Sequence, residues 1–177
     1  MTYLSHWVNI LHNQAYLSLG TNLGDRLKNL EKACIELKQY VVIEKISGVY
    51  ETEPLHYTEQ DAFYNCGLQV SCNLEPLELL SKIKNIEDKI GRVRSIRYGP
   101  RVIDIDIIFW KKECVESFSI VSKNLVIPHP MWSDRLFVIR TMSELDIQKW
   151  MDSDLEKKNI DITKLNQIIT YVCDLDI

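Results

Sequence analysis

Strand-like and helix-like patterns alternate along the first two thirds of this 177-residue sequence, and their order limits the folds that the chain can adopt. Apolar stretches typical of strands are separated twice by segments in which Leu, Ile or Cys recurs every three to four residues, the spacing of one buried helix face. Thr21, Asn22 and Asp25, in the turn after the first strand, are candidate caps of the first helix. The expected strands cover residues 15–19, 41–49, 63–72 and 102–110, and the expected helices cover residues 23–37 and 75–91.

The order strand, helix, two strands, helix and strand is the split βαβ pattern of ferredoxin-like folds. We expect an α+β fold with a ferredoxin-like antiparallel sheet and helices packed on it. Further patterns predict a short strand over residues 124–127, a helix over 137–145 and a terminal helix over 162–172. Residues 1–14 precede the first expected strand, and we interpret them as an N-terminal extension of a single domain over residues 15–177.

The balance of charge excludes some classes of protein. The chain has 21 Lys and Arg against 25 Asp and Glu, a formal net charge of −4. Eight acidic and four basic residues follow position 143, so the excess negative charge lies in an acidic C-terminal tail and the body of the protein is neutral. A neutral body lacks the basic field of a protein that binds nucleic acid without sequence preference. We therefore expect no nucleic-acid partner.

The sequence also bears on location. No apolar run approaches the roughly 20 residues that cross a bilayer, and residues 1–14 lack the basic and apolar segments of a secretory signal. The five cysteines are odd in number and show no CxxC spacing, which is typical of reduced thiols rather than of a disulfide framework or a zinc site. We expect a cytoplasmic protein without a membrane partner.

Two aspartates alternate with isoleucines in the strand expected over residues 102–110, as Asp104-Ile105-Asp106-Ile107. Because side chains alternate across a strand, both carboxylates should lie on one face, about 6.6 Å apart, while the isoleucines enter the core. Two hard carboxylate ligands suit Mg²⁺, which takes further oxygens from water and from substrate phosphates. The pattern predicts a magnesium site, with an ordinary solvent-facing strand as the alternative.

Four arginines and no acidic residue lie in the ten residues that lead into these aspartates. A guanidinium group presents a planar fork of donors that fits phosphate oxygens. We interpret the segment as a loop that binds a polyphosphate; the alternatives are a solvated loop and a loop paired with the acidic tail. The chain contains neither GxxxxGK nor GxGxxG, so a nucleotide would be held without a P-loop or a Rossmann turn. The four residues are Arg92, Arg94, Arg97 and Arg101.

Five motifs occur in a fixed order: GTNLGDR, VYETEPL, FYN, GRVRSIRYGPRVIDIDI and LVIPHP, the last followed by R-x-F. Over residues 15–145 this succession resembles the 6-hydroxymethyl-7,8-dihydropterin pyrophosphokinases of folate biosynthesis. The resemblance implies a ferredoxin-like fold and transfer of the β,γ-pyrophosphoryl group of ATP to the hydroxymethyl group of the pterin, with release of AMP and use of two Mg²⁺ ions. Contact with neighbouring enzymes of the folate pathway is left open.

The resemblance also implies roles for individual residues. Asp104 and Asp106 would bind Mg²⁺, and Arg92 and Arg101 would bind phosphates and matter for turnover. The residues implied at the ATP site are Glu87, Arg94, Ile107, His129 and Arg135, with Tyr98 on the arginine-rich loop, where relatives often have Trp. In the implied pterin pocket Phe63 and Phe137 sandwich the ring, Asn65 reads its polar edge, and Thr52, Pro54 and Leu55 line the walls.

Some residues depart from the family pattern. Asn124 and Val126 stand where relatives often have an Arg and a Thr in contact with ATP. No side chain is an obvious general base, since the resemblance places His129 at the nucleotide. Two other classes stay open: a metal-dependent phosphodiesterase or nuclease, which usually recruits further carboxylates or histidines, and a ferredoxin-like RNA-binding module, which needs stacked aromatics and a basic groove.

Overall fold

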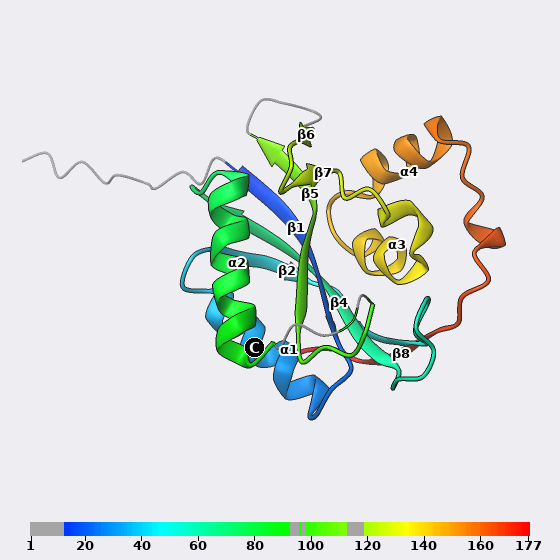
Figure 1. Ribbon diagram of the computed structural model, residues 1–177. Helices are drawn as coiled ribbons and strands as arrows, with labels where there is room; N and C mark the ends of the chain where they lie inside the picture. Colours follow the sequence, from blue (N-terminus) through cyan, green and yellow to red (C-terminus); the bar gives the residue numbers. More distant parts are fainter. Residues whose placement is uncertain (1–12, 93–95, 97, 113–118) are drawn as a thin grey trace, which may run out of the picture.

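The computed structural model describes residues 13–92, 96, 98–112 and 119–177 of the chain (Figure 1). Arg94 and Arg97 of the arginine-rich loop, and residues 1–12 of the expected N-terminal extension, lie outside the described residues. The strands are β1 (Asn13–Thr21), β2 (Val42–Ile46), β3 (Val49–Thr52), β4 (Phe63–Cys72), β5 (Asp104–Lys112), β6 (Ile120–Val121), β7 (Val126–Ile127) and β8 (Ile169–Cys173). The helices are α1 (Arg26–Leu37), α2 (Pro76–Ile90), α3 (Leu136–Ser143) and α4 (Gln148–Lys157), with short 3-10 turns at Trp132–Asp134 and Ile162–Lys164.

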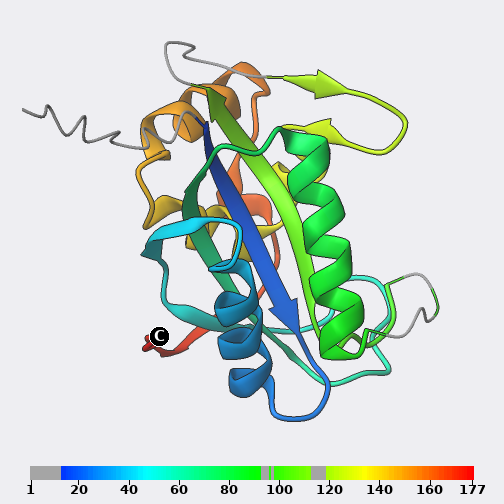
Figure 2. The same cartoon turned by 90° about the vertical axis from the view of Figure 1, so that its left-hand side faces the viewer.

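Six strands form one antiparallel sheet. Five of them follow the order β5-β1-β4-β3-β8, and the sixth, β2, pairs with β4 along the same edge as β3. Helices α1 and α2 cover one face of this sheet, and α3 and α4 lie on the other (Figures 1 and 2). The expected α+β fold with a ferredoxin-like antiparallel sheet is confirmed. None of the helices in the described ranges is long and apolar enough to cross a membrane.

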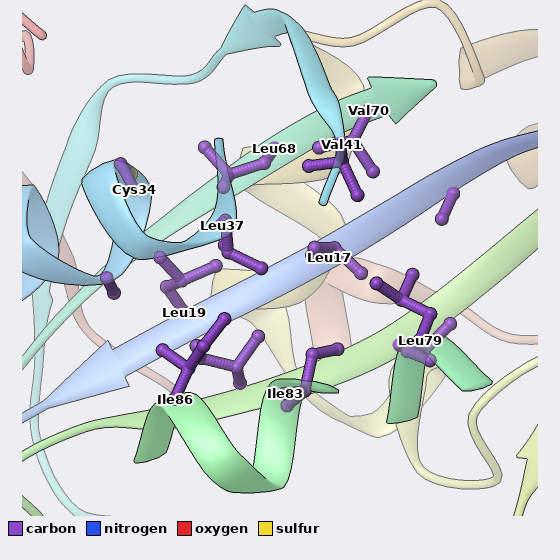
Figure 3. Packing of buried hydrophobic residues seen from close by; sticks show 14 of the residues in the cluster. Leu17, Leu19, Cys34, Leu37, Val41, Leu68, Val70, Leu79, Ile83 and Ile86 are labelled. Carbon is purple, nitrogen blue, oxygen red and sulfur yellow. The ribbon is translucent and has the colours of Figure 1, made fainter. Parts of the chain in front are cut away.

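The larger core lies between the sheet and helices α1 and α2 (Figure 3). Leu17 and Leu19 of β1 alternate with side chains on the opposite face, and Ile83 and Ile86 of α2 pack against them from one helix face, as the periodicity predicts. Ile105 and Ile107 also enter this core. The aspartates of the same strand therefore lie on the opposite face of the sheet.

Helix ends agree with the local sequence. Asp25 caps α1, because its side chain accepts a hydrogen bond from the backbone N–H of Lys28 at 3.2 Å. Helix α2 begins with a capping box of Glu75 and Glu78, with Pro76 as its first residue. It ends at Gly91, whose φ of 110° few other residues adopt, and the arginine-rich loop starts there. Both helices thus begin and end close to the predicted positions.

A second core lies on the other face, where Phe109 packs edge to face against Trp132 with ring centroids 5.0 Å apart. Phe109 reaches this face because of a bulge: Tyr16 pairs with Phe109 and Leu17 with Ile107, so one residue of β5 is extra. The bulge reverses the alternation beyond Ile107. Phe109 and the two aspartates therefore share the face that α3 covers.

Two sequence predictions differ from the structure. The strand expected over residues 41–49 is split into β2 and β3 at Ser47, whose hydroxyl accepts a hydrogen bond from the Gly67 N–H at 2.8 Å and locally interrupts the ladder to β4. The terminal helix expected over residues 162–172 is wrong, since residues 169–173 form β8 and pair with β3. Ile169, Thr170 and Val172 are β-branched residues suited to a strand, and the edge of β3 supplies backbone partners.

Candidate active site

Asp104 and Asp106 lie opposite Gly20 and Ser18 of β1, on the sheet face that α3 covers. The Asp104 side chain is 20% exposed. Burial and the neighbouring Asp106 carboxylate raise the pKa of Asp104, and Arg101 and Arg92 oppose this shift. Two carboxylates side by side on one face of a strand are chemically suited to share a cation.

Three arginines surround the two aspartates. Arg101 forms an ion pair with Asp104, and Arg92 Nη2 lies 2.7 Å from Asp104 Oδ1. On the other side, Arg135 Nη1 lies 3.5 Å from Asp106 Oδ2. The phosphate-binding arginines predicted from the sequence therefore converge on the predicted metal ligands. Arg94 lies outside the described residues, so its place in the site stays a prediction.

Glu87 is buried beneath this group, with 5% of its surface exposed. Its carboxylate accepts a hydrogen bond from the Ile105 N–H at 2.8 Å and forms an ion pair with Arg92. Burial raises the pKa of Glu87 to about 7, although the Ile105 N–H and Arg92 stabilise its charged form. Glu87 thus connects helix α2 to the backbone of β5 between the two aspartates, and it holds Arg92 beside Asp104.

A first pocket opens on the α3 side of the sheet and is lined by all six residues predicted for the pterin. Asn65 of β4 lies at its base, where Nδ2 donates to Thr52 Oγ1 at 2.9 Å. Gly20 allows the close approach of Asn65, because a Cβ at Gly20 would lie 3.1 Å from Asn65 Oδ1. The predicted lining residues are Thr52, Pro54, Leu55, Phe63, Asn65 and Phe137. Tyr98 and Arg135, which the resemblance assigns to the ATP site, also line this pocket, as do Arg101, Asp104 and Asp106.

A second pocket adjoins the first and contains two residues predicted for ATP, Ile107 and His129. Asn124 and Val126, the departures from the family pattern, also line it, and so does Lys123, for which no role was predicted. Asp106 lines both pockets. Molecules bound in the two pockets would therefore meet at Asp106.

His129 is neutral in this setting, because burial and the positive charge of Arg135 lower its pKa to about 4. Its Nδ1 accepts a hydrogen bond from the Met131 N–H at 3.2 Å. The ring proton of the neutral form must then be on Nε2. His129 can donate one hydrogen bond from Nε2 to a ligand without carrying a positive charge.

Asn22 is a residue of the site that sequence reasoning treated only as a helix cap. Its Oδ1 accepts a hydrogen bond from the Arg101 N–H at 2.8 Å, and its Nδ2 donates to Gln60 Oε1 and to Asp61 O, each at 3.0 Å. Gln60 in turn donates to the carbonyl oxygen of Tyr98 at 2.8 Å. Asn22 therefore joins the turn after β1, the β3–β4 loop and the segment before β5. The only sequence signal for it was its place in the GTNLGD motif.

Carboxylates and guanidinium groups that meet between two adjoining pockets are typical of enzymes that transfer phosphoryl groups from one bound molecule to another. This is the class that the fold and the site define. The family model described as 7,8-dihydro-6-hydroxymethylpterin-pyrophosphokinase (HPPK) matches residues 16–147, and the chain belongs to this family. The resemblance drawn from the motifs is confirmed, and the nuclease and RNA-binding alternatives are not supported.

Individual relatives agree with this assignment. The 2-amino-4-hydroxy-6-hydroxymethyldihydropteridine pyrophosphokinase of Bacillus subtilis is 38% identical over 137 residues, which are 76% of this chain and 79% of that protein. The protein of the same name from Aquifex aeolicus is 40% identical over 131 residues, which are 74% of this chain and 79% of that protein.

Other relatives are longer than this chain. The bifunctional protein FolKE of Lactococcus lactis strain IL1403 is 45% identical over 132 residues, 73% of this chain but only 36% of that protein. Among solved structures, Plasmodium falciparum HPPK-DHPS superimposes with a TM-score of 0.60 at 19% identity. That match covers 91% of this chain and 50% of the other chain, and it shows the shared fold.

Proposed function

We propose that this chain transfers the β,γ-pyrophosphoryl group of ATP to the hydroxymethyl oxygen of 6-hydroxymethyl-7,8-dihydropterin and releases AMP. The observation that carries the proposal is the position of Asp106, which lines both pockets. The first pocket takes the pterin and the second takes ATP. The attacking oxygen and the β-phosphorus then meet beside the two aspartates.

The first pocket suits a flat, polar-edged ring. Phe63 and Phe137 offer aromatic faces for stacking. The Asn65 amide, 3% exposed, is held by Thr52 and presents a fixed hydrogen-bonding edge. A site built from fixed polar groups discriminates strongly against rings that lack the matching partners.

The second pocket suits a nucleotide. Neutral His129 donates from Nε2, and Lys123 adds a positive charge next to Asn124, where relatives often have an arginine. We propose that Lys123 supplies part of the positive charge that an arginine at the position of Asn124 supplies in relatives. Glu87 lines neither pocket, and its role is to hold Arg92.

Asp104 and Asp106 fit Mg²⁺ because they offer two adjacent carboxylates whose mutual repulsion a cation would relieve. Two such ions would neutralise the phosphates of ATP and orient them for in-line displacement. Arg92, Arg101 and Arg135 lie where they can stabilise negative charge on the transferring and leaving phosphates. Positioning and charge neutralisation account for most of the catalysis of such a transfer, which needs little covalent help from the protein.

The test is AMP release from ATP by the purified chain with Mg²⁺, measured with the pterin, without it, and with single-stranded RNA or DNA in its place. We expect AMP only with the pterin. Asp104→Asn and Asp106→Asn should each lower this rate by at least about 100-fold, as is typical when a group that stabilises the transition state is removed. Circular dichroism should show that both variants remain folded. AMP release without pterin, or variants that retain the wild-type rate at ordinary Mg²⁺, would refute the assignment.

A further inference from the structure

Three side chains join the C-terminal end of α3 to the start of β3. The Glu144 carboxylate accepts a hydrogen bond from the Gly48 N–H at 2.8 Å and another from the Tyr50 hydroxyl. Arg140 lies beside both, with Nε donating to Tyr50 Oη at 2.9 Å and Nη2 lying 3.3 Å from Glu144 Oε1. Tyr50 is only 5% exposed. We call Tyr50, Arg140 and Glu144 the α3–β3 tie.

The α3–β3 tie and the first pocket are built from the same two elements. Phe137 precedes Glu144 by seven residues, about two helical turns, so the two side chains leave the helix on the same side. Thr52 follows Tyr50 by two residues, so both side chains lie on the same face of β3. Phe137 and Thr52 line the first pocket. The tie therefore closes one end of the contact between α3 and β3, and the pocket lies at the other end.

Tyr50 is also connected to the pocket through its backbone. It pairs with Asn65 in the register of β3 and β4. The carbonyl oxygen of Tyr50 accepts from Asn65 Nδ2 at 3.5 Å, and the same Nδ2 donates to Thr52 Oγ1 at 2.9 Å. A displacement of Tyr50 would therefore change the orientation of the Asn65 amide.

The C-terminal strand packs over the tie. The Tyr171 ring of β8 lies edge to face on Tyr50, with ring centroids 5.8 Å apart. Gly48 leaves room for Tyr171, since a Cβ at Gly48 would lie 2.9 Å from Tyr171 Cε2. Burial and the hydrogen bond to the Glu144 carboxylate raise the pKa of Tyr50, so its hydroxyl stays protonated and remains a donor. Strand β8 lies beyond residues 16–147 of the family match, so this support comes from a part of the chain outside it.

We propose that Tyr50 and Glu144 are positioning residues for the pterin: the α3–β3 tie fixes the spacing of α3 and β3, and so places Phe137 and Asn65 around the ring. This inference rests on the proposed assignment of the first pocket to the pterin. The residues of the second pocket come from α2, β5 and the segment 123–130, none of which belongs to the tie. Loss of the tie should therefore weaken the binding of pterin and leave the binding of ATP unchanged.

Tyr50→Phe is the mildest test, because it keeps the ring against Tyr171 and removes only the hydroxyl. We expect the KM and Kd for pterin to rise about tenfold, because without the hydrogen bond to the Glu144 carboxylate the tie no longer holds α3 and β3 at the spacing that the ring requires. The kcat should stay within about twofold, because the displaced Phe137 and Asn65 would bind the pterin more weakly in the ground state and the transition state alike, and the KM for ATP should not change. Glu144→Ala should act in the same direction. Glu144→Gln keeps one acceptor oxygen for the Gly48 N–H and can donate from its amide to Tyr50 Oη, so it should recover part of the loss.

Asp146→Asn is the matched control. Asp146 lies two residues after Glu144 and pairs with Lys45 of β2 at 2.6 Å, but this ion pair is exposed, and neither residue lines the first or the second pocket. Asp146→Asn should change neither the KM for pterin nor the KM for ATP. If the tie variants lower the melting temperature without raising the KM for pterin, or raise both KM values equally, the tie is merely structural and the inference is wrong.

Asn65→Ala in the same assay separates this inference from the proposed function. If Asn65→Ala raises the KM for pterin and Tyr50→Phe and Glu144→Ala do not, only the role of the tie is refuted. If the wild-type chain forms no AMP with pterin, the proposed function itself fails.

Discussion

Asn22 and Arg101, 79 residues apart in the sequence, are joined by two hydrogen bonds. The Arg101 N–H donates to Asn22 Oδ1 at 2.8 Å, and the Asn22 N–H donates to the Arg101 carbonyl oxygen at 3.0 Å. Arg101 also pairs with Asp104. The backbone of a predicted phosphate-binding arginine is therefore fixed by a buried asparagine in a different loop.

The bond between these residues leads to the first prediction. Asn22→Ala should lower kcat by about tenfold or more, because a slightly misplaced catalytic group is costly even when it is present. Asn29→Ala is the control: Asn29 is a buried residue of the first turn of α1 and donates to Leu23 O at 2.8 Å, but it has no bond to Arg101. Both variants should lose about 1–2 kcal/mol of stability in denaturant titrations. Equal losses of kcat would show that Asn22 acts only through stability.

The raised pKa of Glu87 predicts that the stability of the protein depends on pH. This pKa is raised from 4.5 to about 7 in the folded protein. Between these values the folded state binds more protons than the unfolded state, so this group destabilises the fold progressively as the pH rises from about 4.5 to 7. Glu87→Gln removes the ionisation. The free energy of unfolding of Glu87→Gln minus that of the wild type should therefore increase by up to about 3 kcal/mol between pH 5 and pH 8.

Glu36→Gln is the control for this measurement. The hydrogen bond from Lys89 lowers the pKa of Glu36 in the folded protein. The ionised Glu36 carboxylate therefore contributes its full stabilisation at pH values above its unfolded pKa, and this stabilisation is lost only in acid. The difference between Glu36→Gln and the wild type should therefore be constant from pH 5 to pH 8. A constant difference for Glu87→Gln as well would contradict the raised pKa of Glu87.

Asn65→Ala should weaken the binding of pterin by about tenfold or more and leave that of a non-hydrolysable ATP analogue unchanged, because cutting the amide leaves polar groups of the ring unpaired. His129→Ala should show the opposite selectivity, since His129 lines only the second pocket. Isothermal calorimetry with each ligand alone measures both effects. If Asn65→Ala weakens both ligands equally, the assignment of the first pocket to pterin is wrong.

The N-terminal boundary can be tested by two deletions. Residues 13 and 14 belong to β1, where Asn13 pairs with Cys72 and donates from Nδ2 to Leu74 O at 3.0 Å. Removing residues 1–12 should leave kcat and the melting temperature nearly unchanged. Removing residues 1–14 should lower the melting temperature by several degrees, since about 1 kcal/mol shifts it by a few degrees in a domain of this size. A large loss from the shorter deletion would show that residues 1–12 stabilise the fold.

Local periodicity was enough to predict most of the fold. Helices α1 and α2 each have one apolar face, and residues 104–107 of β5 alternate between the core and the opposite face, so the spacing of these residues reflects the core that they meet. Strand β8 could not be found this way: Ile162, Leu165 and Ile169 have helical spacing, and pairing with the edge of β3 decides the outcome. Helix α4 buries only Met151 and Leu155, too few residues to give a periodic signal.

The features of the site also fall into those that the sequence could predict and those that only the structure shows. Asp104 and Asp106 were predictable because they are neighbours on one strand, where alternation alone places them on one face. The bonds from Asn22 to Arg101 and from Glu87 to Ile105 cross between elements distant in the sequence, and they depend on the packing of the finished fold. Resemblance indicated Glu87 as a residue near the nucleotide, and only the structure shows its contacts with β5 and Arg92.

The transfer itself is tested most directly with ATP that carries a radioactive phosphorus at a known position. With Mg²⁺, the pterin and the wild-type chain, we predict that the γ-label moves to the pterin product while the α-label remains in AMP, in equal amounts. Neither product should form without pterin. Appearance of labelled ADP, or of free pyrophosphate and AMP independent of pterin, would contradict pyrophosphoryl transfer between the two pockets.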